Sequence, residues 1–215
     1  LSGHHFIVTS GPTYEPIDPV RFLGNYSSGT QGSAIAESLL ANGARVTFIT
    51  GPTKVKPPAG ALVKNVMSGA QMFEAVKAAL PADGFIMAAA VADWKTKKIE
   101  KQKIKKHSAE TLDITIIKNT DILKYVSKLK EGRPKLVVGF AAETNDLVKN
   151  ASKKLEQKGC DWVVANDVRS ETQIMGGTDN AISLISKAGS ESWPRMSKAK
   201  VAQRLVQLMV KALEK

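Results

Sequence analysis

Apolar and polar residues alternate in blocks along this chain, and the blocks predict strands and helices in turn. Short, nearly continuous apolar runs are typical of strands buried on both faces of a sheet, and they lie at residues 6–10, 44–50, 84–91, 136–140 and 162–165. Apolar residues at helical spacing predict helices at 33–41, 72–80, 120–130, 146–157 and 197–213. Weaker patterns predict strands at 62–66, 112–118 and 181–185.

This order of strands and helices predicts one domain over residues 1–215, with an α/β, doubly wound, Rossmann-like fold. Its sheet should be rich in parallel strands, with helices on both faces. Ligands in such sheets bind beyond the C-terminal ends of the strands. We therefore expect three segments to meet there: the loop 9–32, the end of 84–91 with Asp93, and residues 141–144.

The connection T-S-G-P-T-Y-E-P-I-D-P-V-R-F-L-G-N-Y-S-S-G-T-Q-G (9–32) has a composition that predicts a long irregular loop, and such loops in compact domains are usually functional or disordered. It ends at a helix N-terminus, where free N–H groups can hold an anion. Gly29-x-x-Gly32 with Ser27 and Ser28 fits either a phosphate cradle or a capped loop. Asn25 fits either a turn residue or an amide that holds a carboxylate or an oxyanion.

The formal net charge of +11 indicates either a solvated lysine-rich surface or an anionic partner. Lysines are densest between Lys95 and Lys106, a segment without useful periodicity. We predict a flexible flap at about 94–110 that closes on phosphates; a merely solvated charge run is the alternative. Aromatic residues make up only 6% of the chain, which gives little support for stacking on single-stranded nucleic acid.

Other residues are compatible with ligand binding and also with plain structural roles. Asp93 follows an apolar strand, where it could bind a ribose hydroxyl or hydrated Mg²⁺, or only cap the strand. Lys154 and Lys158 share one helix face and fit phosphate binding only if that face points at the ligand.

Several known site types are absent from the sequence. Gly11 is followed by Pro12, which breaks the dinucleotide fingerprint, and the second strand ends at Thr50-Gly51 instead of an acid. A P-loop lysine motif and a Tyr-x-x-x-Lys dyad are also missing. These absences argue against a nicotinamide-dependent oxidoreductase. A basic nucleic-acid-binding module rests on charge alone.

Three histidines show no ligand-like spacing, so we predict neither a zinc site nor a catalytic histidine. Cys160 is the only cysteine, which excludes an internal disulfide and fits a reducing cytoplasm. No apolar run is long enough to span a membrane, so no membrane partner is predicted. The chain begins without Met or a signal peptide, and we expect it to be a piece of a longer polypeptide.

Seven segments together resemble phosphopantothenoylcysteine synthetase, the bacterial, CTP-dependent family of coenzyme A biosynthesis. They occur in the family's order over nearly the whole chain: G-P-T-Y-E-P-I-D-P-V-R (11–21), N-Y-S-S-G (25–29), A-A-V-A-D (89–93), K-I-K-K (103–106), K-N-T-D-I-L (118–123), G-F-A-A-E-T (139–144) and A-N-D-V (165–168).

The resemblance implies a ligase that joins 4′-phosphopantothenate and L-cysteine through an acyl-cytidylate and releases pyrophosphate and CMP, with Mg²⁺ assisting. It also implies a homodimer, and in many bacteria a fused FMN-dependent decarboxylase half, so FMN is expected there and not in this domain. The preference for CTP over ATP is carried over from the family.

By the same resemblance, Asn25 holds the acyl intermediate and Lys103 assists formation of the cytidylate. Arg21 lies near the substrate phosphate or reaches the partner subunit's site. Substrate contacts are expected from Ser27, Ser28, Gly29 and Ala90, and nucleotide contacts from Met87, Ala88, Ala89, Asp93, Lys103, Lys106, Thr120, Asp121, Ile122, Leu123, Phe140, Lys154 and Lys158. Metal ligands stay unassigned. The family's usual neighbours of Asn25 are replaced by Gly24 and Tyr26.

Overall fold

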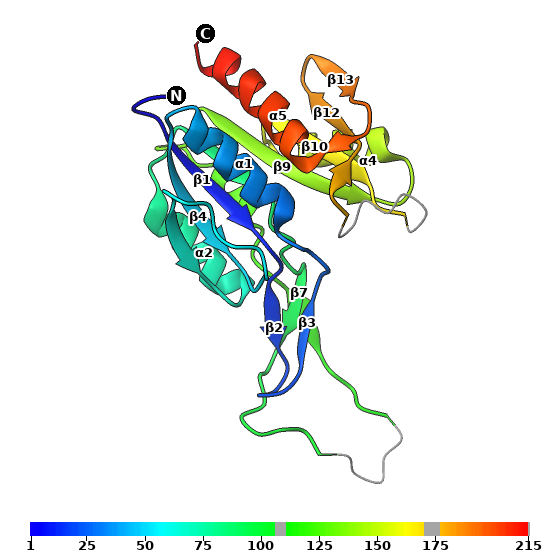
Figure 1. Ribbon diagram of the computed structural model, residues 1–215. Coiled ribbons are helices and arrows are strands. Elements are labelled where there is room, and N and C mark those ends of the chain that lie inside the picture. The colour runs from blue at the N-terminus through cyan, green and yellow to red at the C-terminus, as the bar shows by residue number, and fades with distance from the viewer. Residues whose placement is uncertain (106–110, 170–176, 215) are drawn as a thin grey trace.

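A mostly parallel sheet runs through the computed structural model, which describes residues 1–105, 111–169 and 177–214 (Figure 1). Its eight strands lie in the order β13-β12-β10-β9-β6-β1-β4-β5. They are β1 (His5–Ser10), β4 (Arg45–Thr50), β5 (Leu62–Asn65), β6 (Gly84–Met87), β9 (Leu136–Glu143), β10 (Trp162–Asp167), β12 (Ile182–Ser186) and β13 (Gly189–Ser192).

The strands from β5 to β10 are all parallel, whereas β12 and β13 are antiparallel to their neighbours. Outward from β1, the chain first adds β4 and β5 on one side and then β6, β9 and β10 on the other. This is the doubly wound order, with its reversal between β1 and β6. The predicted Rossmann-like fold is confirmed.

Helices cover both faces because each strand points alternate side chains to opposite sides. Phe6 and Val8 of β1 pack toward α1 (Thr30–Ala41) and α5 (Lys198–Leu213), which lie side by side over one face (Figure 1). Ile7 belongs to the opposite core, with α2 (Gly69–Ala79), α3 (Ile122–Ser127) and α4 (Leu147–Lys158). No helix among the described residues is long and apolar enough to cross a membrane.

The expected bounds of α4 and α5 hold, whereas α1 begins at Thr30 and α2 at Gly69, each three residues before its predicted start. Ser197 caps α5 as predicted, and α4 ends at Gly159 with φ 76°. The cap of α3 is Asp121, whose side chain accepts from Lys124 N, so the predicted cap at residue 119 or 120 is wrong. This helix also ends at Ser127 instead of at residue 130.

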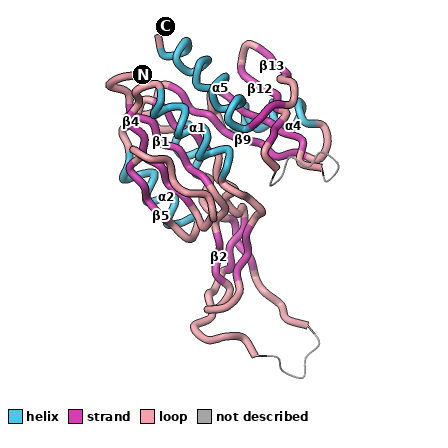
Figure 2. The backbone as a smooth tube through the Cα atoms, viewed as in Figure 1, coloured by secondary structure: helices cyan, strands magenta, loops and turns pink. Residues whose placement is uncertain are grey.

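An arm projects from the carboxyl ends of the strands (Figures 1 and 2). It consists of two small antiparallel pairs, β2 (Tyr14–Pro16) with β3 (Phe22–Gly24) and β7 (Trp94–Thr96) with β8 (Ile116–Lys118), and the loops between them. The prediction of an irregular loop over 9–32 is therefore wrong. The flap predicted from residue 94 without regular structure instead begins with the strand β7. The strand expected at 112–118 begins only at Ile116.

Side-chain contacts explain why these strands form. The rings of Tyr14 and Phe22 stack across the first pair with centroids 3.9 Å apart. Thr96 Oγ1 joins the two pairs by donating to Pro16 O at 2.8 Å. Two further two-residue strands, β11 (Asp179–Asn180) and β14 (Met196–Ser197), pair beside the N-terminus of α5.

The strand predicted over 84–91 ends at Met87, and this early end opens the sheet. Beyond Met87 the chain stays with the loop after β1, since Ala88 N donates to Thr9 O and Ala90 N to Gly11 O. Strand β9, which pairs with β6 up to Met87, continues alongside β10 as far as Glu143. The two halves of the sheet therefore separate at their carboxyl ends.

Candidate functional site

A cleft of about 1100 Å³ occupies this separation. Its walls come from the loop before α1, the segment after β6, the start of α3, the end of β9, and α4. The lining residues are Gly24–Gly29, Gln31, Gly32, Met87–Trp94, Lys118–Leu123, Phe140, Ala142, Lys154, Lys158, Asn166, Val168, Asn180 and Lys198. The expectation that three segments meet beyond the strand ends is confirmed.

Most of the sequence-predicted site residues line this cleft. They are Asn25, Ser27, Ser28, Gly29, Met87, Ala88, Ala89, Ala90, Asp93, Thr120, Asp121, Ile122, Leu123, Phe140, Lys154 and Lys158. Their common location was not deducible from any one segment. The contacts that these residues make with ligands stay a prediction.

Two described residues among those predicted, Lys103 and Arg21, do not line the cleft. Lys103 borders a separate hollow of about 870 Å³ within the arm, and Arg21 donates from the arm to Ile104 O at 3.2 Å. Lys106 lies outside the described residues. The predicted contacts of Lys103 and Arg21 with ligand therefore need a movement of the arm or a second copy of the chain.

Asp18 connects the flap to the β2–β3 hairpin. Its carboxylate accepts from Ile104 N at 3.0 Å, from Val20 N and Arg21 N at 2.8 Å each, and from the Arg21 guanidinium at 2.6 Å. Burial by itself would raise the pKa of Asp18, but these hydrogen bonds and the Arg21 charge lower it to about 2. This arrangement fixes the backbone directly beside Lys103.

Asn25 lies at the mouth of the cleft with an exposed side chain. Its amide Nδ2 donates to Val91 O at 3.3 Å, which joins the loop before α1 to the segment after β6. That long bond leaves the amide available to a ligand in the cleft. The position favours the ligand-binding interpretation over a turn residue alone.

The N-terminus of α1 is held close to β1 by glycines. Gly29 has φ 76° and its carbonyl accepts from Ser10 Oγ at 2.9 Å. A Cβ added to Gly32 would lie 2.5 Å from the same Ser10 Oγ. The N-cap Gly29 has no side chain to cap α1, and among the N–H groups of the first turn Ser28 Oγ accepts only from that of Thr30, so the next N–H groups of this turn remain available to an anion. Ser27 Oγ accepts from Gly29 N within the loop at 3.3 Å, and Ser28 Oγ accepts from the N–H of Thr30, the first residue of α1, at 3.4 Å.

Lys154 and Lys158 of α4 both line the cleft, so their shared helix face points where a bound phosphate would lie. Lys154 Nζ donates to Phe140 O at 2.6 Å. Burial, with a smaller contribution from Lys158, lowers the pKa of Lys154. Lys158 forms an ion pair with Asp121, the cap of α3. These contacts join α3, α4 and β9 along one wall of the cleft.

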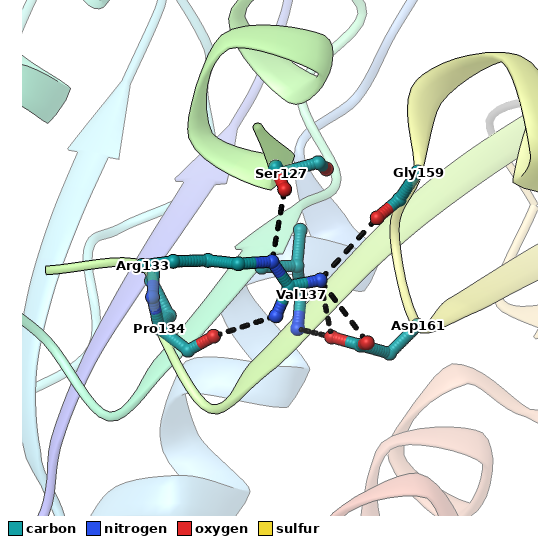
Figure 3. Close-up of polar contacts among 6 residues, drawn as sticks. All are labelled: Ser127, Arg133, Pro134, Val137, Gly159 and Asp161. Carbon is teal, nitrogen blue, oxygen red and sulfur yellow. Dashed lines mark hydrogen bonds and ion pairs between the residues drawn. The ribbon is translucent and has the colours of Figure 1, made fainter. Parts of the chain in front are cut away.

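A second polar network fixes the other ends of these elements (Figure 3). The Arg133 guanidinium donates to Ser127 O at 2.9 Å, to Gly159 O at 3.3 Å and to the Asp161 carboxylate at 3.0 and 3.1 Å. Asp161 in turn accepts from Val137 N at 2.7 Å. Arg133 thereby connects the ends of α3 and α4 to the starts of β9 and β10, a role that sequence reasoning missed.

The cleft also contains residues to which the sequence assigned no role: Gln31, Asn166, Asn180 and Lys198. Asn166 belongs to the quoted A-N-D-V segment, which could have identified it. Asn180 and Lys198 carry no local signal, because they lie far from the recognised segments and read as a strand end and a helix start.

The structure also explains the broken dinucleotide fingerprint. A Cβ on Gly51, at the end of β4, would meet Pro12 O at 1.6 Å. The backbone after β1 therefore covers the position where dinucleotide-binding folds place a ribose-binding acid. This contact argues further against the oxidoreductase alternative.

No group of three or more His, Cys, Asp or Glu able to hold a metal ion occurs among the described residues. Asp93 is an exposed carboxylate in the cleft, whereas Asp121 is paired with Lys158. Mg²⁺ commonly binds through one or two carboxylates together with substrate phosphates. Asp93 fits that mode.

The family model of the DNA/pantothenate metabolism flavoprotein C-terminal domain matches residues 1–213. The coenzyme A biosynthesis bifunctional protein CoaBC of Vibrio vulnificus (strain YJ016) is 42% identical over 208 residues, which are 96% of this chain and 52% of that protein. CoaBC of Escherichia coli (strain K12) is 39% identical over 96% of this chain and 51% of its own length. The chain thus spans about half the length of these relatives.

Among solved structures, the C-terminal domain of a coenzyme A biosynthesis bifunctional protein CoaBC superposes with a TM-score of 0.83. That domain is 35% identical in sequence, and the match covers 100% of this chain and 97% of that one. The similarity therefore extends over the cleft and the arm alike.

Proposed function

Because this chain belongs to the DNA/pantothenate metabolism flavoprotein C-terminal domain family, we propose that it is a phosphopantothenate–cysteine ligase of coenzyme A biosynthesis. It joins 4′-phosphopantothenate and L-cysteine with CTP as co-substrate. The observation that carries the proposal is the cleft, where sixteen residues that the family resemblance implies, from five segments, lie together.

In the first step, a carboxylate oxygen of the acid substrate attacks the α-phosphorus of CTP. The bond from that phosphorus to the bridging oxygen breaks, and pyrophosphate leaves with the electron pair. The α4 lysines Lys154 and Lys158 are placed to neutralise triphosphate charge. Lys103 of a second copy of the chain adds charge at the reacting phosphorus when the arm of that copy covers the cleft.

In the second step, the amine of cysteine attacks the acyl carbon of the cytidylate. An amide bond forms, the acyl–oxygen bond breaks, and CMP leaves. Negative charge develops on the acyl oxygen, and we assign its stabilisation to the Asn25 amide and to N–H groups in the first turn of α1. Orientation of the two reactants in one cleft supplies the remaining catalysis.

Mg²⁺ belongs to this proposal as a partner of the triphosphate. Asp93 is the residue that would hold it, together with phosphate oxygens. When bound, the ion neutralises triphosphate charge and orients the leaving group. FMN belongs to the remaining part of bifunctional relatives and not to this domain. We place the reaction in the cytoplasm, which agrees with a single, buried and unpaired cysteine.

We further propose that the protein acts as a homodimer through the arm. The arm exposes large apolar side chains, an arrangement that marks interaction surfaces; their exposures are 51% for Phe22, 46% for Trp94, 56% for Leu112 and 44% for Ile116. A second copy covering them explains how Lys103, remote from the cleft of its own chain, meets a nucleotide.

The reaction is tested by following pyrophosphate release with CTP and 4′-phosphopantothenate, and then amide formation after cysteine is added. Replacing CTP by ATP measures the base preference. We expect nucleotide-dependent pyrophosphate release before cysteine is present. Its complete absence from a folded, dimeric sample would contradict the proposal.

Two variants separate the proposed roles. Asn25→Asp should still release pyrophosphate but form little amide, because a second carboxylate repels the acyl oxyanion. Lys103→Gln should stop before pyrophosphate release, while Lys101→Gln, the same change nearby in the flap, should behave as wild type. Failure of Asn25→Asp and Lys103→Gln at the same step would refute this division of roles.

Mixing the two inactive variants tests the dimer. If Lys103 acts on the cleft of the partner subunit, a mixed dimer has one site with both residues intact, and activity returns. Phe22→Ser should lower the apparent molecular mass in sedimentation velocity. Unchanged mass in that variant, with no recovery on mixing, would exclude the arm as the interface.

A further inference from the structure

One corner of the cleft contains a lysine, Lys198, to which the proposed reaction assigns no role. Lys198 is the first residue of α5 and lies at the edge of the cleft formed with α1. Only 6% of the residue is exposed, and no described residue lies within hydrogen-bond or ion-pair distance of its ammonium, on which the Asp179 carboxylate acts at longer range. A buried, unpaired cation is costly unless a ligand supplies the opposite charge.

Two amides complete this corner, Asn180, which is buried, and Gln31, which is partly buried. Gln31, in the first turn of α1, donates through Nε2 to Lys198 O at 3.1 Å. Asn180 Nδ2 donates to Gln31 Oε1 at 3.2 Å, and Asn180 is only 4% exposed. The side-chain amide oxygen of Asn180, Oδ1, has no hydrogen-bond partner among the described residues. This network holds the uncapped end of α1 against the residue that carries the ammonium.

The charge of the corner is positive. The carboxylate that interacts with Lys198, Asp179, is itself 3.6 Å from the Arg195 guanidinium. Burial lowers the pKa of Lys198 and Asp179 opposes that effect. The first-turn N–H groups of α1 add a partial positive charge on the same side. The combined field selects an anionic group with several acceptor oxygens.

We propose that Lys198, with Gln31 and Asn180, forms a subsite for the anionic end group of one of the two substrates that meet in the acyl-transfer step. That group is either the phosphate of the acid or the carboxylate of the amino acid. The inference rests on the proposed function. The nucleotide is a poorer candidate, because the proposed function assigns its phosphates to Lys154 and Lys158.

The test compares each substrate with an analogue that lacks only the anion. Pantothenate lacks the phosphate of 4′-phosphopantothenate, and cysteamine lacks the carboxylate of L-cysteine. For one of these pairs, Lys198→Gln should reduce the preference in kcat/KM for the anionic member by roughly tenfold or more, as expected when one charge-assisted hydrogen bond is lost. Lys198→Arg should retain most of the preference. If Lys198→Gln loses the preference for 4′-phosphopantothenate over pantothenate, the subsite binds the phosphate. If it loses the preference for L-cysteine over cysteamine, the subsite binds the carboxylate.

Lys200→Gln is the matched control, since it makes the same change at an exposed position two residues along α5. Unchanged preferences for both pairs in Lys198→Gln, or an effect on the KM of CTP alone, would overturn the subsite. Lys198→Met and thermal melting of all variants separate loss of the cation from loss of the fold.

Calorimetric binding of 4′-phosphopantothenate against pantothenate, and of L-cysteine against cysteamine, repeats the comparison without turnover. An enzyme that binds the anionic member selectively through Lys198 but forms no amide would contradict the proposed reaction while leaving the subsite intact. Equal binding of both members of each pair by the wild type would contradict the subsite directly.

Discussion

Replacing Arg133 by Met removes the network of Figure 3 while keeping a long unbranched side chain. The guanidinium is the sole group that connects Ser127 O, Gly159 O and the Asp161 carboxylate within the described part of the chain. Without it, two carbonyls at helix ends lose their donor. Asp161 keeps only the N–H of Val137 as a partner.

The size of the expected loss of stability follows from the partial burial of the Arg133–Asp161 ion pair. The side chains of Arg133 and Asp161 are 27% and 33% exposed, so the pair is neither a surface ion pair nor a fully buried one. Surface pairs contribute about 0–1 kcal/mol, and removal of one partner from a buried pair costs about 3–5 kcal/mol. Counting the two helix-end carbonyls left without their donor, we expect Arg133→Met to lower the free energy of unfolding by about 2–4 kcal/mol.

Urea denaturation followed by circular dichroism measures this change. For a domain of this size, a loss of about 3 kcal/mol lowers Tm by roughly 6–12 °C. Arg45→Met is the control, because Arg45 is exposed and has no ion-pair partner among the described residues. That variant should stay within about 0.5 kcal/mol of wild type.

Neither Arg133 nor Asp161 lines the cleft, so pyrophosphate release well below Tm should be unchanged in Arg133→Met. The reasoning fails if Arg133→Met is as stable as Arg45→Met. It also fails if Asp161→Asn lowers the stability by the same amount in wild type and in Arg133→Met, since equal effects in the two backgrounds mean that the two groups do not act together.

Three further changes test other parts of the structure. Gly32→Ala places a Cβ 2.5 Å from Ser10 Oγ, so both Tm and amide formation should fall, as melting and product assays would reveal. Asp18, whose pKa is lowered to about 2, stabilises the fold fully above the unfolded pKa of about 3.9 and loses this effect as pH falls toward 2; in urea titrations, the deficit of Asp18→Asn should be constant from about pH 7 to 5 and shrink near pH 3. Lys154→Met should raise the KM of CTP by roughly tenfold or more while leaving that of cysteine unchanged, which steady-state kinetics would check.

The buried sheet was predictable because burial on both faces leaves a strong sequence pattern. Runs such as those in β1 and β9 have few polar interruptions, and their alternation with amphipathic helices permits few topologies. The end of β6 was not predictable from the same pattern. Ala88–Val91 continues the apolar run, but its backbone hydrogen bonds go to the loop after β1, a choice set by tertiary contacts.

The arm escaped prediction for a related reason. Its strands have three residues each, too few to show a period of two, and three prolines lie in or beside the first pair. What stabilises them is contact between segments distant in the sequence, such as Thr96 with Pro16. Patterns within a single segment cannot show such contacts.

The residues of the cleft also differ in whether local sequence could predict them. Residues next to strand ends and in recognisable segments, such as Asn25 and Asp93, were predictable as candidates, because doubly wound folds bind ligands at those ends. Lys198 was not, since it approaches the cleft only through the packing of α5 on α1, more than a hundred residues away in the chain.

That difference bears on how the ligase would distinguish its substrates. The walls predicted from sequence carry groups suited to a nucleotide and to an acyl oxygen, which any acid-activating enzyme of this kind needs. Under the proposed reaction, the corner formed by α1 and α5 would instead present the cation of Lys198 to the part of a substrate beyond its acyl group. A neutral substrate would leave that charge unpaired, and the penalty would act against it. Substrate choice would then rest on residues that carry no catalytic signature, which is why the analogue pairs test Lys198 more sharply than loss of activity does.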